Sequence, residues 1–226
     1  MKKILLTLFM ALTLTAAQAQ RIHAYVAAGT VTSQIEGDEL KGFSHWNATG
    51  AVGAIAQLDN RDRWSLYVET GYACRGVYNQ RRSSQNYYNI KLDLHYVDIP
   101  LMVSFHDPYG GMRVGLGFVY SRLLGQPHGT VDYRPEYFIP DSSDMSFLKN
   151  DIAPAIEFRF DLWKRLQFSA RYQYSLIPVK KDWKFTQIER GEENTWYNDC
   201  YNSSLMFRLL WLFGDDGSYS HKKKRR

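Results

Sequence analysis

The chain has 226 residues, of which 45% are hydrophobic and 15% aromatic, and its mean hydropathy is −0.41. A formal charge of +5 and a pI of about 9.1 suggest a nucleic-acid partner, but seven of the 28 Lys and Arg residues lie at the two ends, at Lys2, Lys3 and Lys222–Arg226. The other 21 bases face 23 acids, so the body of the chain is close to neutral. This balance argues against a nucleic-acid-binding domain, whose body would be basic.

The N-terminus has the pattern of a secretory signal peptide. A basic start (residues 1–3) precedes an apolar run (4–14) and the small-x-small site Ala17-Gln18-Ala19. The run is too short to span a membrane, and no later stretch has the ~18 apolar residues of a transmembrane helix. We therefore expect a signal peptide over 1–19, one domain over 20–213 and a basic tail over 214–226.

Eight extended segments follow in the mature chain, each alternating with period two. They lie at about 22–31, 47–58, 64–75, 96–105, 112–121, 155–162, 166–176 and 205–213. In the segment 96–105, Val and Ile at odd positions alternate with polar or small residues such as Asp98 and Ser104. Such alternation predicts β-strands with one apolar face. Pro100 lacks an N–H donor, so we expect a bulge or a missing ladder hydrogen bond there.

The connections alternate between short and long. Those at 59–63, 106–111 and 163–165 are tight, whereas those at 32–46, 76–89, 125–150 and 179–199 are long and polar. This pattern is typical of an up-and-down barrel with one short-turned rim and one elaborated rim. In outer-membrane barrels the short turns face the periplasm and the long loops face outward. An even number of strands then places both termini in the periplasm.

A soluble barrel with an apolar interior competes with a membrane barrel. Here one face of the segments collects charges of both signs with Gly and Ser, and the other is almost uncharged. Aromatic residues cluster at both ends of the apolar face, with Trp64 and Phe105 near the short turns and Tyr72 and Tyr120 near the long loops. Such aromatic girdles are typical of membrane barrels. The sequence predicts an all-β, eight-stranded antiparallel up-and-down transmembrane β-barrel in the outer membrane.

The inward charges predict a structural lumen network. Its members are Glu69, Asp98, Arg113, Glu157, Arg159, Arg171 and Arg208. Charges of opposite sign can pair there and offset the cost of burial, and we expect Asp98 to pair with Arg113 across the hairpin. Eight strands leave an interior that side chains fill, which argues against a diffusive pore.

No catalytic, cofactor or metal site is expected. Ser44-His45, His95 near Asp93 and His106-Asp107 are interpreted as loop, interface or turn residues. The six His are dispersed and the two Cys lack metal spacing. Cys74 and Cys200 are expected to remain unpaired, because their predicted strands are not neighbours.

The stretch Tyr96-Val-Asp-Ile-Pro-Leu-Met-Val-Ser-Phe105 resembles the aromatic-x-acid-Ile-Pro-Leu stretch of the PorT-type outer-membrane β-barrel family. Gly115-Leu-Gly-Phe118 and Arg171-Tyr-Gln-Tyr174 are also similar to that family. The resemblance implies an eight-stranded outer-membrane barrel and little about activity, since most members of the family have no assigned activity and only the namesake branch is tied to protein secretion. A terminal aromatic is the usual barrel-assembly signal, whereas Phe213 here is followed by thirteen residues, Gly214 to Arg226.

The functional expectation is a non-enzymatic barrel whose long loops, chiefly 125–149 and 179–198, serve surface interaction or the assembly of an envelope or secretion complex. The expected partners are outer-membrane lipid, lipopolysaccharide, the barrel-assembly machinery and an envelope or secretion protein, without nucleic acid. The alternatives are an outer-membrane lipid-modifying enzyme or protease, and a narrow channel.

Overall fold

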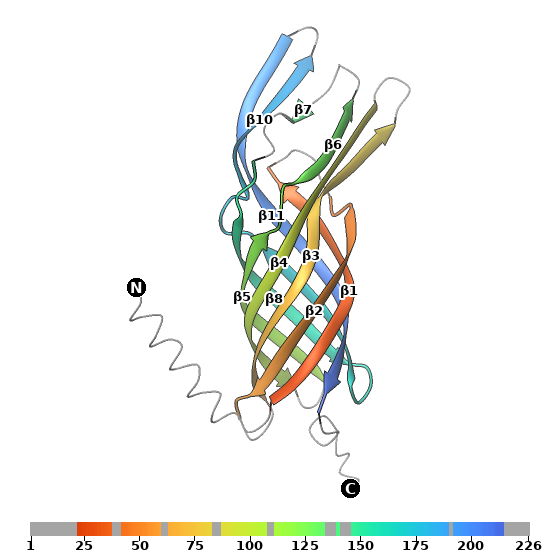
Figure 1. The fold of residues 1–226 in the computed structure, drawn as a ribbon, viewed down its shortest axis with the longest axis vertical. Coiled ribbons are helices and arrows are strands. Elements are labelled where there is room, and N and C mark those ends of the chain that lie inside the picture. The colour runs from red at the N-terminus through yellow and green to blue at the C-terminus, as the bar shows by residue number, and fades with distance from the viewer. Residues whose placement is uncertain are drawn as a thin grey trace, which may run out of the picture.

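The computed structural model describes residues 22–37, 42–59, 63–82, 87–107, 111–133, 139–140, 146–189 and 192–214 (Figure 1). The described residues form eleven strands: β1 (Ile22–Glu36), β2 (His45–Gln57), β3 (Trp64–Arg82), β4 (Tyr87–Asp107), β5 (Met112–Leu123), β6 (His128–Tyr133), β7 (Ile139–Pro140), β8 (Asn150–Asp161), β9 (Leu166–Tyr174), β10 (Lys180–Glu189) and β11 (Glu192–Phe213). Within these ranges no helix could cross a membrane. The predicted signal peptide and almost all of the predicted tail lie outside the described residues.

Eight of the strands close into an antiparallel barrel in the order β1-β2-β3-β4-β5-β8-β9-β11, with β11 pairing back onto β1. Neighbours in the barrel are neighbours in sequence apart from the inserted short strands, so the topology is up-and-down. Ala24 near the start of β1 faces Phe213 at the end of β11, which places both chain ends of the barrel at the short-turn end. The predicted eight-stranded antiparallel barrel is confirmed.

The membrane-facing surface follows the predicted faces. On β4, Ile99, Leu101, Val103 and Phe105 are each about 40% exposed, whereas their neighbours Asp98, Pro100, Met102 and Ser104 are buried. Trp64 at the short-turn end and Tyr72 at the other end mark the limits of this apolar band on β3. Residues 64–72 and 97–105, which we call the membrane belt of β3 and β4, have the ~9–11 residues of a barrel crossing.

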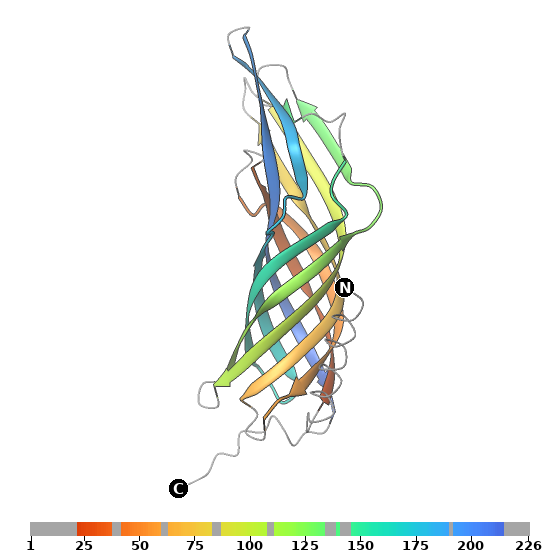
Figure 2. The same cartoon turned by 90° about the vertical axis from the view of Figure 1, so that its left-hand side faces the viewer.

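The prediction that the four long connections are loops is wrong, because each of them contains β-strand residues. Strands β3, β4 and β11 continue well past the belt, and β6, β7 and β10 lie within the stretches predicted as loops. The β10–β11 hairpin and the β3–β4 hairpin rise as two separate projections from the same end of the barrel (Figures 1 and 2). β6 pairs with β4, and β7 pairs with β10. The prediction identified strands by an apolar outward face, and the strands have such a face only where they contact lipid.

Beyond the belt the polarity of the two faces is reversed. On β4, Leu92, Leu94 and Tyr96 are buried, whereas Lys91 is exposed and Asp93 is half-buried. The inward side chains join a hydrophobic cluster, which we call the outer core: Ile35, Val77, Leu92, Leu94, Tyr96, Leu123, Phe147, Val179, Trp183, Phe185 and Cys200, with Trp196 packed against it. Here the interior is apolar, as in a soluble barrel.

The expected interruption at Pro100 is present, without a bulge. The β3–β4 pairing passes from Val68↔Leu101 to Gly71↔Asp98 and omits the pairs that Pro100 and Ile99 would make. The register is the same on both sides of the gap. The β4–β5 pairing, in contrast, runs unbroken through Pro100↔Val119. The missing N–H therefore affects only the side of the strand that faces β3.

Candidate functional site

A buried network of five charged side chains, which we call the central network, crosses the lumen within the membrane belt. Its members are Glu69, Glu157, Arg159, Arg171 and Arg208, each at most 4% exposed. Arg171 contacts Glu69 Oε1 and Glu157 Oε2 at 2.8 Å each. Arg208 contacts Glu69 at 2.6 Å and Glu157 at 3.1 Å, and Arg159 Nε contacts Glu157 at 3.0 Å. Each arginine thus has a carboxylate partner, as buried charges require.

Two tyrosines complete this network. Tyr25 Oη donates a hydrogen bond to Glu69 Oε2 at 2.6 Å, and Tyr67 Oη donates to Glu157. The guanidinium of Arg159 lies over the Tyr67 ring, 3.9 Å from its centroid, and also near Tyr25 at 5.1 Å. The cation–π contacts add to the ion pair that Arg159 makes with Glu157.

The predicted Asp98–Arg113 pair is wrong. The hairpin register places Asp98 opposite Ser121 and Arg113 opposite His106, far apart along the strands. Asp98 instead pairs with Arg75 from the neighbouring strand β3, and Arg113 Nη1 contacts Asp161 at 2.6 Å. The seven predicted lumen residues therefore divide between the central network, which holds five of them, and two smaller clusters above and below it.

The upper cluster joins the central network to the outer core. Arg75 is fully buried, contacts Asp98 and lies 3.9 Å from Asp151, which also accepts a hydrogen bond from Ser175 Oγ at 2.7 Å. The Arg75 guanidinium also lies 5.0 Å from the centroid of the Tyr96 ring, a member of the outer core. Within the belt the lumen is thus filled by charged layers together with an apolar cluster that includes Ile55, Met102 and Leu210, and beyond the belt it is filled by the apolar outer core, as expected for eight strands.

Sequence reasoning missed Tyr25 and Asp151 in this lumen. Tyr25 lies in the segment whose faces are blurred by Ala and Gly, and Asp151 lies just past the predicted loop 125–150. A usable signal did exist for Asp151, because it continues the odd-numbered inward face of β8 that carries Glu157 and Arg159. The segment predicted at 155–162 begins four residues after Asp151 and so does not include it.

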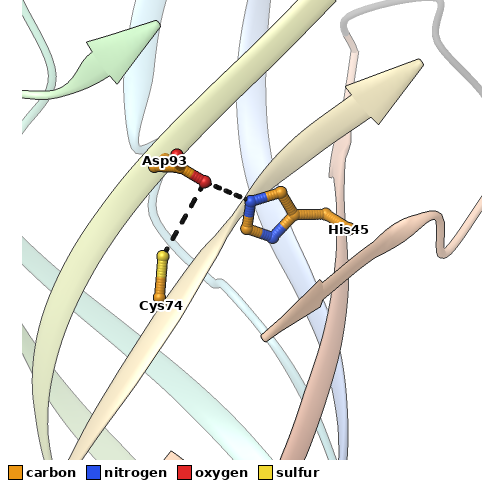
Figure 3. A group of neighbouring side chains, drawn as sticks. All are labelled: His45, Cys74 and Asp93. Carbon is orange, nitrogen blue, oxygen red and sulfur yellow. Dashed lines mark hydrogen bonds and ion pairs between the residues drawn. The ribbon is translucent and has the colours of Figure 1, made fainter. Parts of the chain in front are cut away.

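A second cluster lies just beyond the belt, where His45, Cys74 and Asp93 converge from β2, β3 and β4 (Figure 3). His45 Nε2 lies 2.6 Å from Asp93 Oδ1, and Cys74 Sγ lies 3.9 Å from the same oxygen. Sequence spacing could not reveal this group, because its members are brought together only by strand pairing. The cysteine's free thiol agrees with the expectation that Cys74 and Cys200 do not pair.

The histidine–acid pairs considered from the sequence are rearranged here. Asp93 contacts His45 and Lys91, the latter at 2.9 Å, rather than His95. His95 Nδ1 is instead hydrogen-bonded to Tyr72 Oη at 2.6 Å, and its ring meets that of His128 edge-on at 6.2 Å. The outward face at this level therefore carries several imidazoles beside the cluster.

The environment shifts the ionisation of the cluster. Burial is the main cause that raises the pKa of the Cys74 thiol to about 11, and the nearby Asp93 carboxylate acts in the same direction. Burial opposes ionisation of Asp93 as well, yet hydrogen bonds from His45 and Lys91 hold the pKa of its carboxyl below the usual value. Cys74 is thus a neutral thiol at neutral pH and Asp93 a carboxylate.

Ser33, His45 and Asp93 lie in the order of a hydrolase triad. Ser33 Oγ is 3.4 Å from His45 Nδ1, but it also donates to the carbonyl of Gly76 at 3.0 Å and accepts from its N–H at 2.9 Å. Ser33 is fully buried. Only glycine fits at position 76, because its φ is +147° and a Cβ there would lie 1.8 Å from the carbonyl oxygen of Leu92. Ser33 is thus hydrogen-bonded to the backbone of Gly76 and does not offer an accessible nucleophile.

The chain was compared with solved structures, with curated proteins and with models of protein families. The solved structures similar to this chain include Ail from Yersinia pestis, 13% identical, with a TM-score of 0.43 over 84% of this chain and 98% of that one. OprG from Pseudomonas aeruginosa is 13% identical, with a TM-score of 0.39 over 88% and 99%. A search of curated proteins found no match. A family model described as "Outer membrane protein beta-barrel domain" matches residues 16–181, more than half of the chain. The chain therefore belongs to the outer membrane protein beta-barrel domain family and is an outer-membrane protein.

Proposed function

We propose that this protein is a non-enzymatic outer-membrane barrel that uses the projections beyond its belt to bind a partner at the cell surface. The observation that carries the proposal is the length of the strands. β4 has 21 residues and β11 has 22, whereas a crossing needs only ~9–11. About half of each strand therefore builds a structured platform outside the bilayer, supported by the outer core.

The orientation follows from the same asymmetry. We propose that the platform faces the cell exterior and that the short turns and both termini face the periplasm, after removal of a signal peptide over 1–19. We further propose that the partner is an envelope or secretion protein, since residues 96–105 resemble the PorT-type family, one branch of which is tied to protein secretion.

Labelling of single cysteines tests the orientation. In a chain whose two native cysteines are replaced by serine, Thr195→Cys at the β10–β11 hairpin should react with a membrane-impermeant maleimide in intact cells. Lys164→Cys in the β8–β9 turn should react only after the outer membrane is permeabilised. Both positions are exposed, so accessibility within the folded barrel is matched. The reverse pattern would contradict the proposed orientation.

Partner binding is tested on the outward face of the β10–β11 hairpin. Lys184 and Tyr197 are paired across this hairpin and both exposed, Tyr197 by 60%. The double variant Lys184→Glu, Tyr197→Ala should lose the proteins that cross-link to the wild type in intact cells. Its matched control, Trp163→Ala with Lys164→Glu, removes an exposed aromatic side chain and reverses the charge at a lysine position in the β8–β9 turn. Equal cross-linking in both variants would refute the role of this face.

The channel alternative makes a separate expectation. The central network and the outer core occupy the lumen at two successive levels, so purified barrels in planar bilayers should give no resolved conductance steps. Stable unitary currents from the wild-type chain would instead favour the channel.

A further inference from the structure

We propose that His45, Cys74 and Asp93 form a binding site for a divalent transition-metal ion of the Zn²⁺ class, at the level where the barrel leaves the membrane. The site is distinct from the partner-binding face proposed above. It would join three strands of the wall through one ion.

The geometry brings three ligand atoms to one point. His45 Nε2, Cys74 Sγ and one Asp93 oxygen all lie within 4.8 Å of one another. Figure 3 shows the three side chains pointing toward one another from β2, β3 and β4. Zn–S bonds of ~2.3 Å and Zn–N or Zn–O bonds of ~2.0 Å separate the ligands of a tetrahedral ion by roughly 3.3–3.7 Å, so small rotations of these side chains suffice.

The donor set selects the class of ion. Imidazole, thiolate and carboxylate together suit Zn²⁺, whereas Mg²⁺ and Ca²⁺ prefer oxygen ligands alone. Three protein ligands leave a fourth tetrahedral position for water. Asp93 retains a partly exposed side chain, at 20%, which gives an ion a path from solvent to a site whose His45 is only 2% exposed.

The surrounding contacts resemble those that support metal ligands. Lys91 contacts Asp93 Oδ2 at 2.9 Å, which leaves Oδ1 directed at His45 and Cys74. Asn47 Nδ2 lies 3.4 Å from Cys74 Sγ and can donate to a thiolate. Ser33 Oγ lies 3.4 Å from His45 Nδ1, the nitrogen that would not bind the ion. Partners of this kind orient ligands and strengthen binding.

Binding requires a defined proton balance. The Cys74 thiol loses its proton to solvent and binds as thiolate. His45 moves its ring proton from Nε2, which faces Asp93, to Nδ1, next to Ser33, so that Nε2 can bind the ion. Asp93 binds as the carboxylate it already is. One proton is therefore released for each ion bound.

The position of the site suggests what the ion would stabilise. The pairing of β2 with β3 ends at Thr49↔Ala73, and His45 lies beyond that point. Without an ion, the start of β2 is tied to the β3–β4 hairpin through side chains such as His45 and Asp93. A bound ion would replace the 2.6 Å contact between these two residues by three coordinate bonds. It would thereby fasten the base of the β3–β4 projection.

Zn²⁺ titration of the full mature chain, purified in detergent and stripped of metal by a chelator, tests the proposal. The wild type should bind one Zn²⁺ per chain. Cys74→Ser and Asp93→Asn should each weaken binding by at least ~100-fold, because even outer partners of a metal site contribute ~10–100-fold. Asn47→Ala should weaken it by about 10-fold.

The matched control is Cys200→Ser, which removes the other buried cysteine and should leave Zn²⁺ binding unchanged. Co²⁺ gives a second readout, since the wild type should show a thiolate-to-metal charge-transfer band that Cys74→Ser lacks. Heat-modifiable migration on a gel confirms that each variant is folded. A wild type that binds no Zn²⁺, or equal affinity in wild type and Cys74→Ser, would overturn the proposal.

Discussion

The two halves of this barrel solve opposite packing problems with one continuous sheet. Within the belt the lumen holds Glu69, Glu157 and three arginines, and the outer wall is apolar. Beyond the belt the interior holds Leu94 and Phe185, both fully buried, and the outer wall is polar. The change follows the solvent outside: lipid requires apolar side chains on the outward face, and water permits charged ones.

This contrast shows what determines the interior. Side chains alternate strictly along a strand, so an apolar outward face leaves the inward face free to be polar. Inside the belt, the barrel gains little by burying apolar groups away from lipid, and ion pairs and hydrogen bonds hold its interior beside a buried apolar cluster around Met102 and Leu210. Outside the belt, burial from water stabilises the interior in the ordinary way.

The largest expected effect is in the charged half. Glu157 contacts Arg159, Arg171 and Arg208, so Glu157→Gln leaves three buried arginines with Glu69 as the remaining carboxylate of the central network. We expect a loss of about 3–5 kcal/mol in the free energy of unfolding. Urea unfolding of the barrel in lipid or detergent measures it. Glu193→Gln, at an exposed position of β11, is the control, and an equally small effect in both variants would contradict the network's role.

The apolar half should respond more locally. Phe185 is fully buried between Trp183 and Trp196, with ring centroids 5.1 and 6.2 Å away. Phe185→Ala should cost about 3 kcal/mol, and the loss should be confined to the outer core. Amide exchange should therefore accelerate in β10 and in residues 192–200 but not in the belt. The control Tyr197→Ala removes an exposed aromatic from the same hairpin and should change neither the free energy of unfolding nor the exchange rates. If Phe185→Ala accelerated exchange equally in both halves, the halves would unfold together.

The smallest effects are expected at the edges of the charged half. Asp98→Asn removes one partner of Arg75 but leaves Asp151 3.9 Å away, so we expect the free energy of unfolding to fall by about 2 kcal/mol.

Asp161→Asn weakens the ion pair with Arg113. Because this aspartate is 19% exposed, the free energy of unfolding should fall by about 1 kcal/mol or less. Unfolding in urea ranks the two. The opposite order would mean that exposure does not control the strength of these pairs.

Local pattern explains why much of the fold was predictable. The membrane-facing strands repeat one rule, apolar out and polar in, and a barrel of this kind needs no long-range information beyond the order of its strands. Residues such as Ile99, Leu101 and Asp98 therefore lie on the predicted faces. The same rule misled beyond the belt, where Leu92 and Phe185 point inward and the polar outward face resembled a loop.

Alternation with period two can be read from the sequence, and it is enough to predict the eight-stranded barrel, the lipid-facing surface and the presence of charges of both signs in the lumen. Which charges pair depends on the tertiary structure. Arg75 takes Asp98 because β3 lies beside β4, and Arg113 is left to Asp161 because the hairpin register separates it from Asp98. The meeting of His45, Cys74 and Asp93 likewise depends on how three strands are arranged side by side and not on any spacing along the chain.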